Sequence, residues 1–444
     1  MLPISLFPQA AGVNSENHLL LGGCDSVELA TEFGTPLYVF DEATLRGKCA
    51  EYREEFARRY LNTSIIYAAK AFINRALAQI VKEEGLGLDV VSGGELAIAR
   101  SVDFPLDRAY FHGSNKSRGE LELAIEWGVG RIVVDNFLEL SLLNDVAKEA
   151  GVRQNILLRL SPGVDPHTHA HVATGVVDSK FGFPIALAEA ALAEALATSN
   201  LDPIGLHFHL GSQLFQLQPY REAIDICFRF TAEMKSRYGF KLEEFSPGGG
   251  LAIAYTEDAS PPAIAEFAAV ISSAILDKSR ELDLEPPLLI VEPGRSIVGQ
   301  AGVALYTVGS TKEIPGVRKY VSVDGGMADN IRPVLYGSQY QAVVANKVVG
   351  DLEPVTIAGR FCESGDILIR DIDLPRVEHG DVIAVAGAGA YCLSLASNYN
   401  ASLKPAIVLV KEGKARLIRR RQSYEDLMSH DVFRGMSRVA DCGT

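Results

Sequence analysis

The chain has 444 residues, of which 48% are hydrophobic, and includes 40 glycines and 20 prolines, as expected of a globular protein with two domains. Its formal net charge of −14 argues against nucleic acid or an anionic membrane surface as a partner and favours a small-molecule ligand. Six scattered cysteines form no CxxC pair, which argues against a disulfide framework or a zinc site and predicts a reducing, cytoplasmic location. Residues 1–17 lack the basic start and apolar core of a signal peptide, and no apolar run is long enough to predict a membrane-spanning helix.

From residue 64 to residue 295, short β-branched or aliphatic runs alternate with stretches of helical spacing. Eight runs predict strands, which end at Ala69, Val91, His112, Asp135, Leu160, His209, Pro247 and Glu292. The intervening stretches predict helices over 75–84, 94–101, 120–127, 138–150, 186–198, 220–238 and 263–282. Eight strands interleaved with helices in one block favour a closed parallel (β/α)8 barrel over an open sheet.

After about residue 301 the pattern changes to strand-like runs separated by glycine and proline turns. These runs cover 303–308, 320–323, 342–349, 355–358, 382–385 and 407–410. They predict a second, C-terminal all-β domain, and the strand-like run 36–40 is expected to pair into it. We therefore predict the barrel over 42–300 and the β domain over 1–41 and 301–444.

Chemically reactive groups stand at the ends of the predicted barrel strands, where barrel enzymes build their active sites. The Lys70 amine can form a Schiff base with an aldehyde, and the three glycines at 248–250 let backbone N–H groups approach a phosphate. A glutamate such as Glu292 can hold a pyridine nitrogen protonated, and His209 can lie flat on a ring. As an ordered set these residues predict a pocket for pyridoxal 5'-phosphate.

Each of these residues also has an ordinary structural interpretation. A lone lysine at a strand end is usually a solvated surface residue, and three glycines can form a simple flexible turn. The phosphate interpretation is favoured because Gly294 and Arg295 offer a second anion-binding candidate after the next strand. Small neighbours around Lys70 predict a partly desolvated amine with a lowered pKa, which favours the neutral nucleophile.

With its motifs taken in chain order, the sequence resembles the fold type III pyridoxal phosphate enzymes, and within them the ornithine and diaminopimelate decarboxylase family. The resemblance extends over nearly the whole chain. It rests on YAAKA at 67–71, HTHAHVATG and SKFG within 167–182, HFHLGSQ at 207–213, GGG at 248–250, EPGR at 292–295, DGGMADNIRPVLY at 324–336, CESGD at 362–366 and GAYCLSLASNYN at 389–400.

The resemblance implies a role for each matching residue. Lys70 matches the lysine that binds the cofactor aldehyde, His209 the imidazole stacked on its ring, and Glu292 the acid at its pyridine nitrogen. The other residues implied to hold the cofactor are Asp89, Ser212, Gly248, Gly249, Gly250, Pro293, Gly294, Arg295 and Tyr391. Those implied to contact substrate are Arg295, Arg332, Tyr336, Glu363 and Tyr391, and Cys362 matches the proton donor. His112, Arg159 and His207 are left as candidates that support the site from behind.

The resemblance further implies decarboxylation of meso-2,6-diaminopimelate to L-lysine and CO2, the last step of lysine biosynthesis. It also implies a homodimer in which the CESGD segment enters the active site of the other subunit. Two alternatives stay open: a decarboxylase of another basic amino acid (ornithine, lysine or arginine), and a noncatalytic pyridoxal phosphate carrier. A substrate with only a distal ammonium would be bound better by an acidic residue at position 332, whereas Arg332 suits a substrate with a distal carboxylate.

Three alternating histidines, His167, His169 and His171, would share one face of a strand and could bind zinc. Pro166 opens this run, however, and no cysteine or acid within it completes a site. We interpret the run as a loop at the active site and expect no metal.

Overall fold

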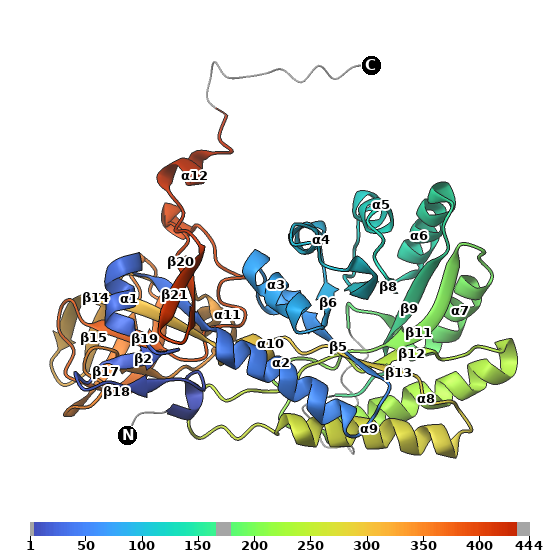
Figure 1. The fold of residues 1–444 in the computed structure, drawn as a ribbon, viewed down its shortest axis with the longest axis horizontal. Helices are drawn as coiled ribbons and strands as arrows, with labels where there is room; N and C mark the ends of the chain where they lie inside the picture. Colours follow the sequence, from blue (N-terminus) through green and yellow to red (C-terminus); the bar gives the residue numbers. More distant parts are fainter. Residues whose placement is uncertain (1–3, 166–178, 433–444) are drawn as a thin grey trace.

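The computed structural model describes residues 4–165 and 179–432. The histidine triplet and the HTHAHVATG motif lie outside the described residues. Figure 1 shows two bodies side by side: strands ringed by helices on one side, and a mostly sheet domain on the other, with the long helix α2 (Glu42–Ala57) running between them. None of the helices in the described part of the chain combines the length and hydropathy needed to cross a bilayer.

The first body is the predicted (β/α)8 barrel. Its parallel strands are β5 (Thr63–Ala68), β6 (Gly87–Val90), β7 (Ala109–Phe111), β8 (Arg131–Val134), β9 (Gln154–Ser161), β11 (Leu201–His207), β12 (Glu244–Ser246) and β13 (Leu288–Val291). Each strand pairs with the next in chain order, and the pairing of β13 with β5 closes the ring. The eight predicted strands and their closed arrangement are therefore confirmed. The short β10 (Phe183–Pro184) pairs with the C-terminal end of β9.

Helices follow the strands because a capping side chain begins several of them shortly after a strand ends. The helices are α3 (Arg75–Glu83), α4 (Gly93–Arg100), α5 (Arg118–Glu126), α6 (Phe137–Ala150), α7 (Ile185–Leu196), α8 (Gln218–Tyr238) and α9 (Ile264–Glu281). In the first turn of α3, α4, α5 and α6, a backbone N–H donates a hydrogen bond to the side chain of Asn74, Ser92, Ser117 and Asn136 respectively. All seven agree with the predicted helices to within about two residues at each end, the accuracy at which helix boundaries are defined.

The second body is built on another sheet. Its main path runs β18 (Ile367–Pro375), β17 (Leu352–Ala358), β15 (Arg318–Val323), β14 (Gly302–Ile314), β4 (Leu37–Asp41), β20 (Ala406–Lys411) and β21 (Lys414–Arg419). Off this path, β16 (Ala342–Val344) pairs with β19 (Val382–Val385), which also pairs with β14. As predicted, the strand before the barrel joins this sheet, because β4 pairs with β14 and β20.

The sequence pattern does not predict several further elements of the fold. A small sheet of β1 (Gly12–Val13), β2 (Leu19–Leu21) and β3 (Cys24–Asp25) precedes α1 (Ser26–Phe33), and short helices α10 (Arg295–Val298), α11 (Arg332–Tyr336) and α12 (Tyr424–Met428) occur later in the chain. Strands β18 and β21 were also not predicted, because charged residues interrupt their apolar pattern. The predicted strand over 342–349 was too long, since β16 ends at Val344.

Candidate active site at the mouth of the barrel

A narrow cavity opens where the barrel strands end. Its lining brings together residues from four strand ends and from the β domain: Ala68, Lys70, His209, Ser212, Gly250, Leu251, Glu292, Gly294, Arg295, Ser296 and Tyr391. The closed parallel barrel explains this clustering, because it places all strand carboxyl ends around one mouth. Eight of the residues expected to hold the cofactor thus lie around one cavity.

The other four expected cofactor residues stand directly behind this lining. The Asp89 carboxylate contacts Lys70, and Gly248 lies against His209. A Cβ on Gly249 would meet the carbonyl oxygen of Glu292, while the Pro293 carbonyl accepts a hydrogen bond from the Ala68 N–H. These four residues do not line the cavity themselves but contact residues that do.

Lys70 lies just past β5, with its amine 3.0 Å from the carboxylate of the fully buried Asp89. Burial by itself would lower the pKa of the Lys70 ammonium, but Asp89, with Tyr391 and Glu292, outweighs burial and raises it above its ordinary value. The expected lowered pKa is therefore wrong for the protein alone. The small neighbours predict partial desolvation, but the sequence does not show that the Asp89 carboxylate from the adjacent strand lies beside the amine.

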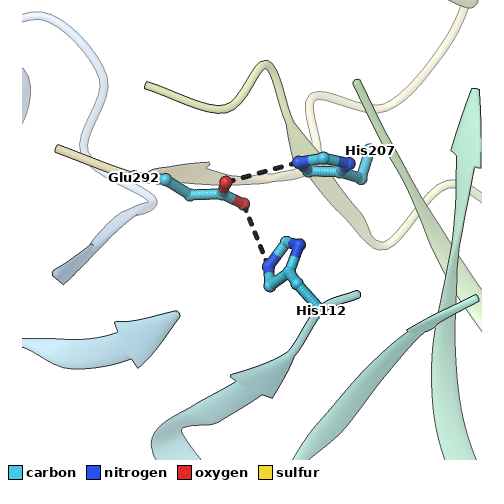
Figure 2. Close-up of side chains that lie close together, drawn as sticks. All are labelled: His112, His207 and Glu292. Atoms are coloured by element: carbon cyan, nitrogen blue, oxygen red, sulfur yellow. Dashed lines mark hydrogen bonds and ion pairs between the residues drawn. The ribbon is translucent and has the colours of Figure 1, made fainter. Parts of the chain in front are cut away.

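Glu292 follows β13 and is buried, and three neighbours surround its carboxylate. The Ser246 hydroxyl donates to Oε1 at 2.6 Å, His207 Nε2 lies 3.3 Å from Oε2, and His112 Nε2 lies 3.6 Å from Oε1. Figure 2 shows the two imidazoles converging on the carboxylate from different strands. Burial alone would raise the pKa of Glu292, but His207 and then His112 outweigh it and lower the pKa to about 2. Glu292 is therefore ionised at neutral pH.

The two histidines pack edge to face, with ring centroids 4.9 Å apart. Burial lowers the pKa of His112 well below its ordinary value, although the neighbouring Glu292 carboxylate acts to raise it. His112 and His207 both contact the Glu292 carboxylate, and their role in supporting the site stays a prediction. The ligand atoms of His112, His207 and Glu292 lie within 4.8 Å of one another, a grouping that could also hold a metal ion, so the absence of a metal stays a prediction.

The glycine triplet follows β12 and leaves no room for side chains. Gly248 and Gly250 have φ values of +75° and +105°, and a Cβ on Gly250 would lie 2.4 Å from the Gly211 carbonyl oxygen. Glycines without side chains leave their backbone N–H groups accessible to an anion, and a neighbouring cation favours a phosphate at this position. The Nδ1 atom of His209 is buried without a hydrogen-bond partner, and burial, with Lys70, lowers the pKa of this imidazole. Both features fit pyridoxal phosphate.

Arg295 supplies the cation beside the glycines. Its Nη2 and Nε donate to the Ser212 hydroxyl at 2.8 and 3.2 Å, and its Nη1 donates to the Tyr255 hydroxyl at 2.6 Å. The guanidinium also lies 4.7 Å from the ring centroid of Tyr391, a residue held at a left-handed φ of +59°. Such a conformation is strained for a tyrosine and is typically retained at functional sites.

Three of the expected substrate residues and the expected proton donor lie outside this cavity within one chain, whereas Tyr391 lines it. Arg332, at the start of α11, is only 4% exposed, and its guanidinium donates to the Tyr340 hydroxyl and faces the Tyr255 ring. Tyr336 is 65% exposed, and Cys362 and Glu363 are exposed as well. None of these four residues is among those lining the Lys70 cavity.

Three residues near the site make contacts that the sequence did not predict, or predicted only in part. Ser246 directly precedes Pro247 and the glycine triplet, a position that could have marked it, whereas nothing in the sequence marked Tyr255. Arg159 was a candidate for support, and its Nε lies 3.8 Å from Asp135 Oδ1 behind the barrel mouth.

Comparison with known proteins supports the same assignment. The family model for the pyridoxal binding domain of pyridoxal-dependent decarboxylases matches residues 42–299. The chain is 46% identical over 423 residues to the diaminopimelate decarboxylase of Bacillus subtilis (strain 168), covering 94% of this chain and 96% of that protein. It is 44% identical over 439 residues to the diaminopimelate decarboxylase of Synechocystis sp. (strain ATCC 27184 / PCC 6803 / Kazusa), covering 97% and 93%.

Among solved structures, the diaminopimelate decarboxylase of M. jannaschii in complex with L-lysine superposes with a TM-score of 0.91 at 37% identity, covering 98% of this chain and 99% of that one. The family model spans more than half of the chain, and the relatives match it over nearly its full length. The chain therefore belongs to the pyridoxal-dependent decarboxylases, and within them to the diaminopimelate decarboxylase family.

Proposed function

We propose that this protein decarboxylates meso-2,6-diaminopimelate to L-lysine and CO2 with pyridoxal 5'-phosphate as its cofactor, the last step of lysine biosynthesis. One observation carries the choice of substrate. Arg332 is buried, and among the described residues no carboxylate lies within ion-pair distance of its guanidinium. A buried cation without an acid partner is costly, so the arrangement favours an anionic ligand such as a distal carboxylate.

The cavity residues have distinct roles in this proposal. Bound pyridoxal phosphate supplies an aldehyde that joins an amine and a ring that withdraws electrons from the substrate α-carbon. Lys70 presents the amine that holds the aldehyde, and Asp89 orients it. Glu292, ionised and held by Ser246, would keep a proton on the ring nitrogen. Arg295 and the glycine backbone would bind the phosphate, and Cys362 would deliver a proton to the α-carbon.

A comparison of substrates tests this proposal directly. The purified protein is incubated separately with meso-diaminopimelate, ornithine, lysine and arginine, and CO2 release is measured. Release from diaminopimelate alone is the expected result. Release from one of the other three would assign the chain to another basic amino acid, and no release from any substrate, with cofactor bound, would identify a noncatalytic carrier.

We further propose that the chain divides into a barrel over 42–300 and a β domain over 1–41 and 301–444, and that two copies form a dimer with shared active sites. The position of Cys362 supports this, because it is exposed and outside its own chain's Lys70 cavity. A hollow of about 1010 Å³ lies nearby in the β domain, with Val334, Val349 and Leu352 among its lining residues. These three apolar side chains are exposed, so a second copy covering them would remove apolar surface from water.

Complementation between two inactive variants tests the shared site. Lys70→Ala and Cys362→Ala are unfolded and refolded together, and decarboxylation is measured. If Lys70 and Cys362 of one site come from different chains, every mixed dimer contains one intact site, and activity returns. If both came from one chain, every site in a mixed dimer would carry a lesion. Lack of activity, with mixed dimers detected by mass spectrometry, would show that each site is built within one subunit.

We also propose a cytoplasmic location. Cys24, Cys49, Cys227, Cys362 and Cys392 are all free thiols, as is usual in a reducing compartment, and Cys442 lies outside the described residues. Fractionation of cells that express the protein, followed by detection in each fraction, tests this location.

A further inference from the structure

A hairpin loop of the β domain carries the expected proton donor. The loop, 359–366, connects the antiparallel strands β17 and β18, whose pairing reaches Ala358 and Ile367 at its base. Cys362 and Glu363 lie within the loop and are exposed, whereas Asp366 at its end is only 3% exposed. Because exposed loops are mobile unless contacts hold their backbone, the position of the Cys362 thiol depends on such contacts.

The buried Asp366 carboxylate supplies two of them. Its Oδ2 accepts a hydrogen bond from the Phe361 N–H at 2.9 Å, and its Oδ1 accepts one from the Met327 N–H at 2.7 Å. The first bond folds the loop back on itself directly before Cys362, and the second ties the loop to the segment that leads into α11. Hydrogen bonds from backbone N–H groups to a carboxylate are stronger than those between neutral groups.

Two glycines leave the space that this carboxylate occupies. An added Cβ on Gly359 would collide with Asp366 Oδ2, and one on Gly326 would lie 2.6 Å from Asp366 Oδ1. In the part of the chain that the structure describes, no cation lies within ion-pair distance of Asp366. The carboxylate therefore holds two backbone segments together and does not balance a neighbouring positive charge.

Other contacts act on the same side of the loop. The Arg360 N–H donates to the Gly325 carbonyl at 3.0 Å, and the Phe361 ring meets the Tyr399 ring edge to face, with centroids 5.5 Å apart. The backbone directly before Cys362 is thus held to its own domain, while the Cys362 side chain itself is exposed.

We propose that Asp366 is a positioning residue that fixes the Cys362 thiol relative to the substrate α-carbon and thereby confines protonation to one face of that carbon. This inference rests on the proposed function. There the Cys362 S–H bond breaks, the proton bonds to the electron pair that departing CO2 leaves on the α-carbon, and solvent returns a proton to the thiolate. A thiol held in one place delivers its proton from one side. Asp366 acts through the loop backbone and takes no part in the chemical step itself.

Two variants disturb this carboxylate in different ways. Asp366→Asn keeps the shape of the side chain, but its NH2 group cannot accept a hydrogen bond, so either the Phe361 or the Met327 N–H loses its acceptor. Gly359→Ala keeps the charge and displaces the carboxylate, because the added methyl group would occupy its place.

Asp381→Asn is the matched control. Asp381 is also buried in the β domain, but its carboxylate accepts a hydrogen bond from the Glu378 N–H at 2.6 Å and lies 2.7 Å from Lys347 Nζ. Its replacement therefore weakens the same domain at another turn and leaves the contacts of the Cys362 loop unchanged.

The first measurement is decarboxylation of meso-diaminopimelate in D2O. The reacting carbon of the product lysine then carries one hydrogen and one deuterium, and NMR after chiral derivatisation gives the share of each configuration. Wild type and Asp381→Asn are expected to give one configuration. Asp366→Asn and Gly359→Ala are expected to give both and to lose kcat by about ten- to a hundred-fold, because solvent can deuterate either face when the thiol is misplaced. Loss of stability alone would reduce active enzyme without mixing the configurations.

The second measurement needs no turnover. Amide hydrogen exchange of the holoenzyme, followed by mass spectrometry on the peptide that covers 359–366, reports how firmly the loop is held. Exchange in this peptide is expected to be faster by about ten-fold or more in Asp366→Asn and Gly359→Ala, because local opening is easier once the carboxylate contacts are lost. In Asp381→Asn it should equal that of the wild type.

Several outcomes would overturn the inference. A single configuration from both variants would do so even if kcat falls, as would unchanged exchange in the loop or mixed configurations from Asp381→Asn. If Asp366→Asn does not fold, as judged by its melting temperature and cofactor content, Gly359→Ala decides alone. Failure of the proposed function is distinguishable, because it would appear as a wild-type holoenzyme that releases no CO2 from diaminopimelate, whereas failure of this inference leaves that release intact.

Discussion

Replacing Glu292 with glutamine tests the electrostatics of the cavity, because glutamine keeps the shape of the side chain and removes its charge. In the structure the carboxylate accepts a hydrogen bond from Ser246 and lies 3.3 Å from His207. An amide keeps one acceptor for Ser246 but presents an NH2 group to one of the other neighbours. The cofactor should still bind, because Lys70, Arg295 and the glycine backbone are unchanged.

Two magnitudes follow from this substitution. The pKa of Glu292 is lowered from 4.5 to about 2, and at about 1.4 kcal/mol per pH unit this gap favours the ionised carboxylate by roughly 3 kcal/mol in the folded protein. Because the folded-state pKa is lowered, this stabilisation is fully present above pH 4.5 and is lost as the pH falls toward 2. For turnover, loss of a preorganised charge at the reacting group typically costs about a hundred- to a thousand-fold in kcat.

The assays are kcat for diaminopimelate, cofactor content by absorbance, and the free energy of unfolding in urea between pH 6 and pH 8. We expect Glu292→Gln to bind cofactor, to lose kcat by at least a hundred-fold, and to be less stable than the wild type. A kcat within about three-fold of the wild type would refute the catalytic role of Glu292. Equal stability of variant and wild type would refute the stabilising contacts of its carboxylate.

Glu244→Gln is the matched control. Glu244 is also a buried glutamate of the barrel, but it lies at the start of β12, where its carboxylate pairs with Arg131 at 2.5 Å and accepts a hydrogen bond from Tyr110 at 2.9 Å. Its replacement should lower stability without lowering kcat. An equal loss of kcat in both variants would show that damage to the barrel, and not the charge at its mouth, causes the effect.

Three further predictions concern other residues. Borohydride should trap the cofactor on the peptide that contains Lys70, and mass spectrometry that finds it on another lysine would overturn the pocket assignment. Arg332→Ala should raise the KM for diaminopimelate by at least about 30-fold, since truncating a buried charged contact typically costs about 2 to 5 kcal/mol, and an unchanged KM in steady-state assays would reopen the choice of substrate. Burial raises the pKa of Asp329 from 3.8 to about 6, against the hydrogen bond from Tyr306, so Asp329 should contribute a fall in stability of roughly 3 kcal/mol as the pH rises from 4 to 6. Urea unfolding should show that Asp329→Asn lacks this fall, and an identical fall in the variant would exclude Asp329 as its source.

The local pattern of the sequence was enough to predict the barrel and the location of its site. Alternating apolar runs and helical spacing identified eight strands and seven helices, because these periodicities reflect which side of each element is buried. Reactive residues at successive strand ends then implied one cavity, since a closed parallel barrel brings those ends together. Elements without a strong apolar pattern were not predicted. One example is β21, a mostly exposed strand that lies at the end of the main sheet and pairs with β20.

The tertiary structure alone decided how these groups interact. The raised pKa of Lys70 depends on Asp89 from the neighbouring strand, and the ionised state of Glu292 depends on two histidines from two other strands. The contacts of Tyr255 with Arg295 and Arg332 join residues 40 and 77 positions apart in the chain. Distances of a few ångströms between such residues are set by barrel closure and by the packing of one domain on the other, which short-range sequence periodicity does not encode.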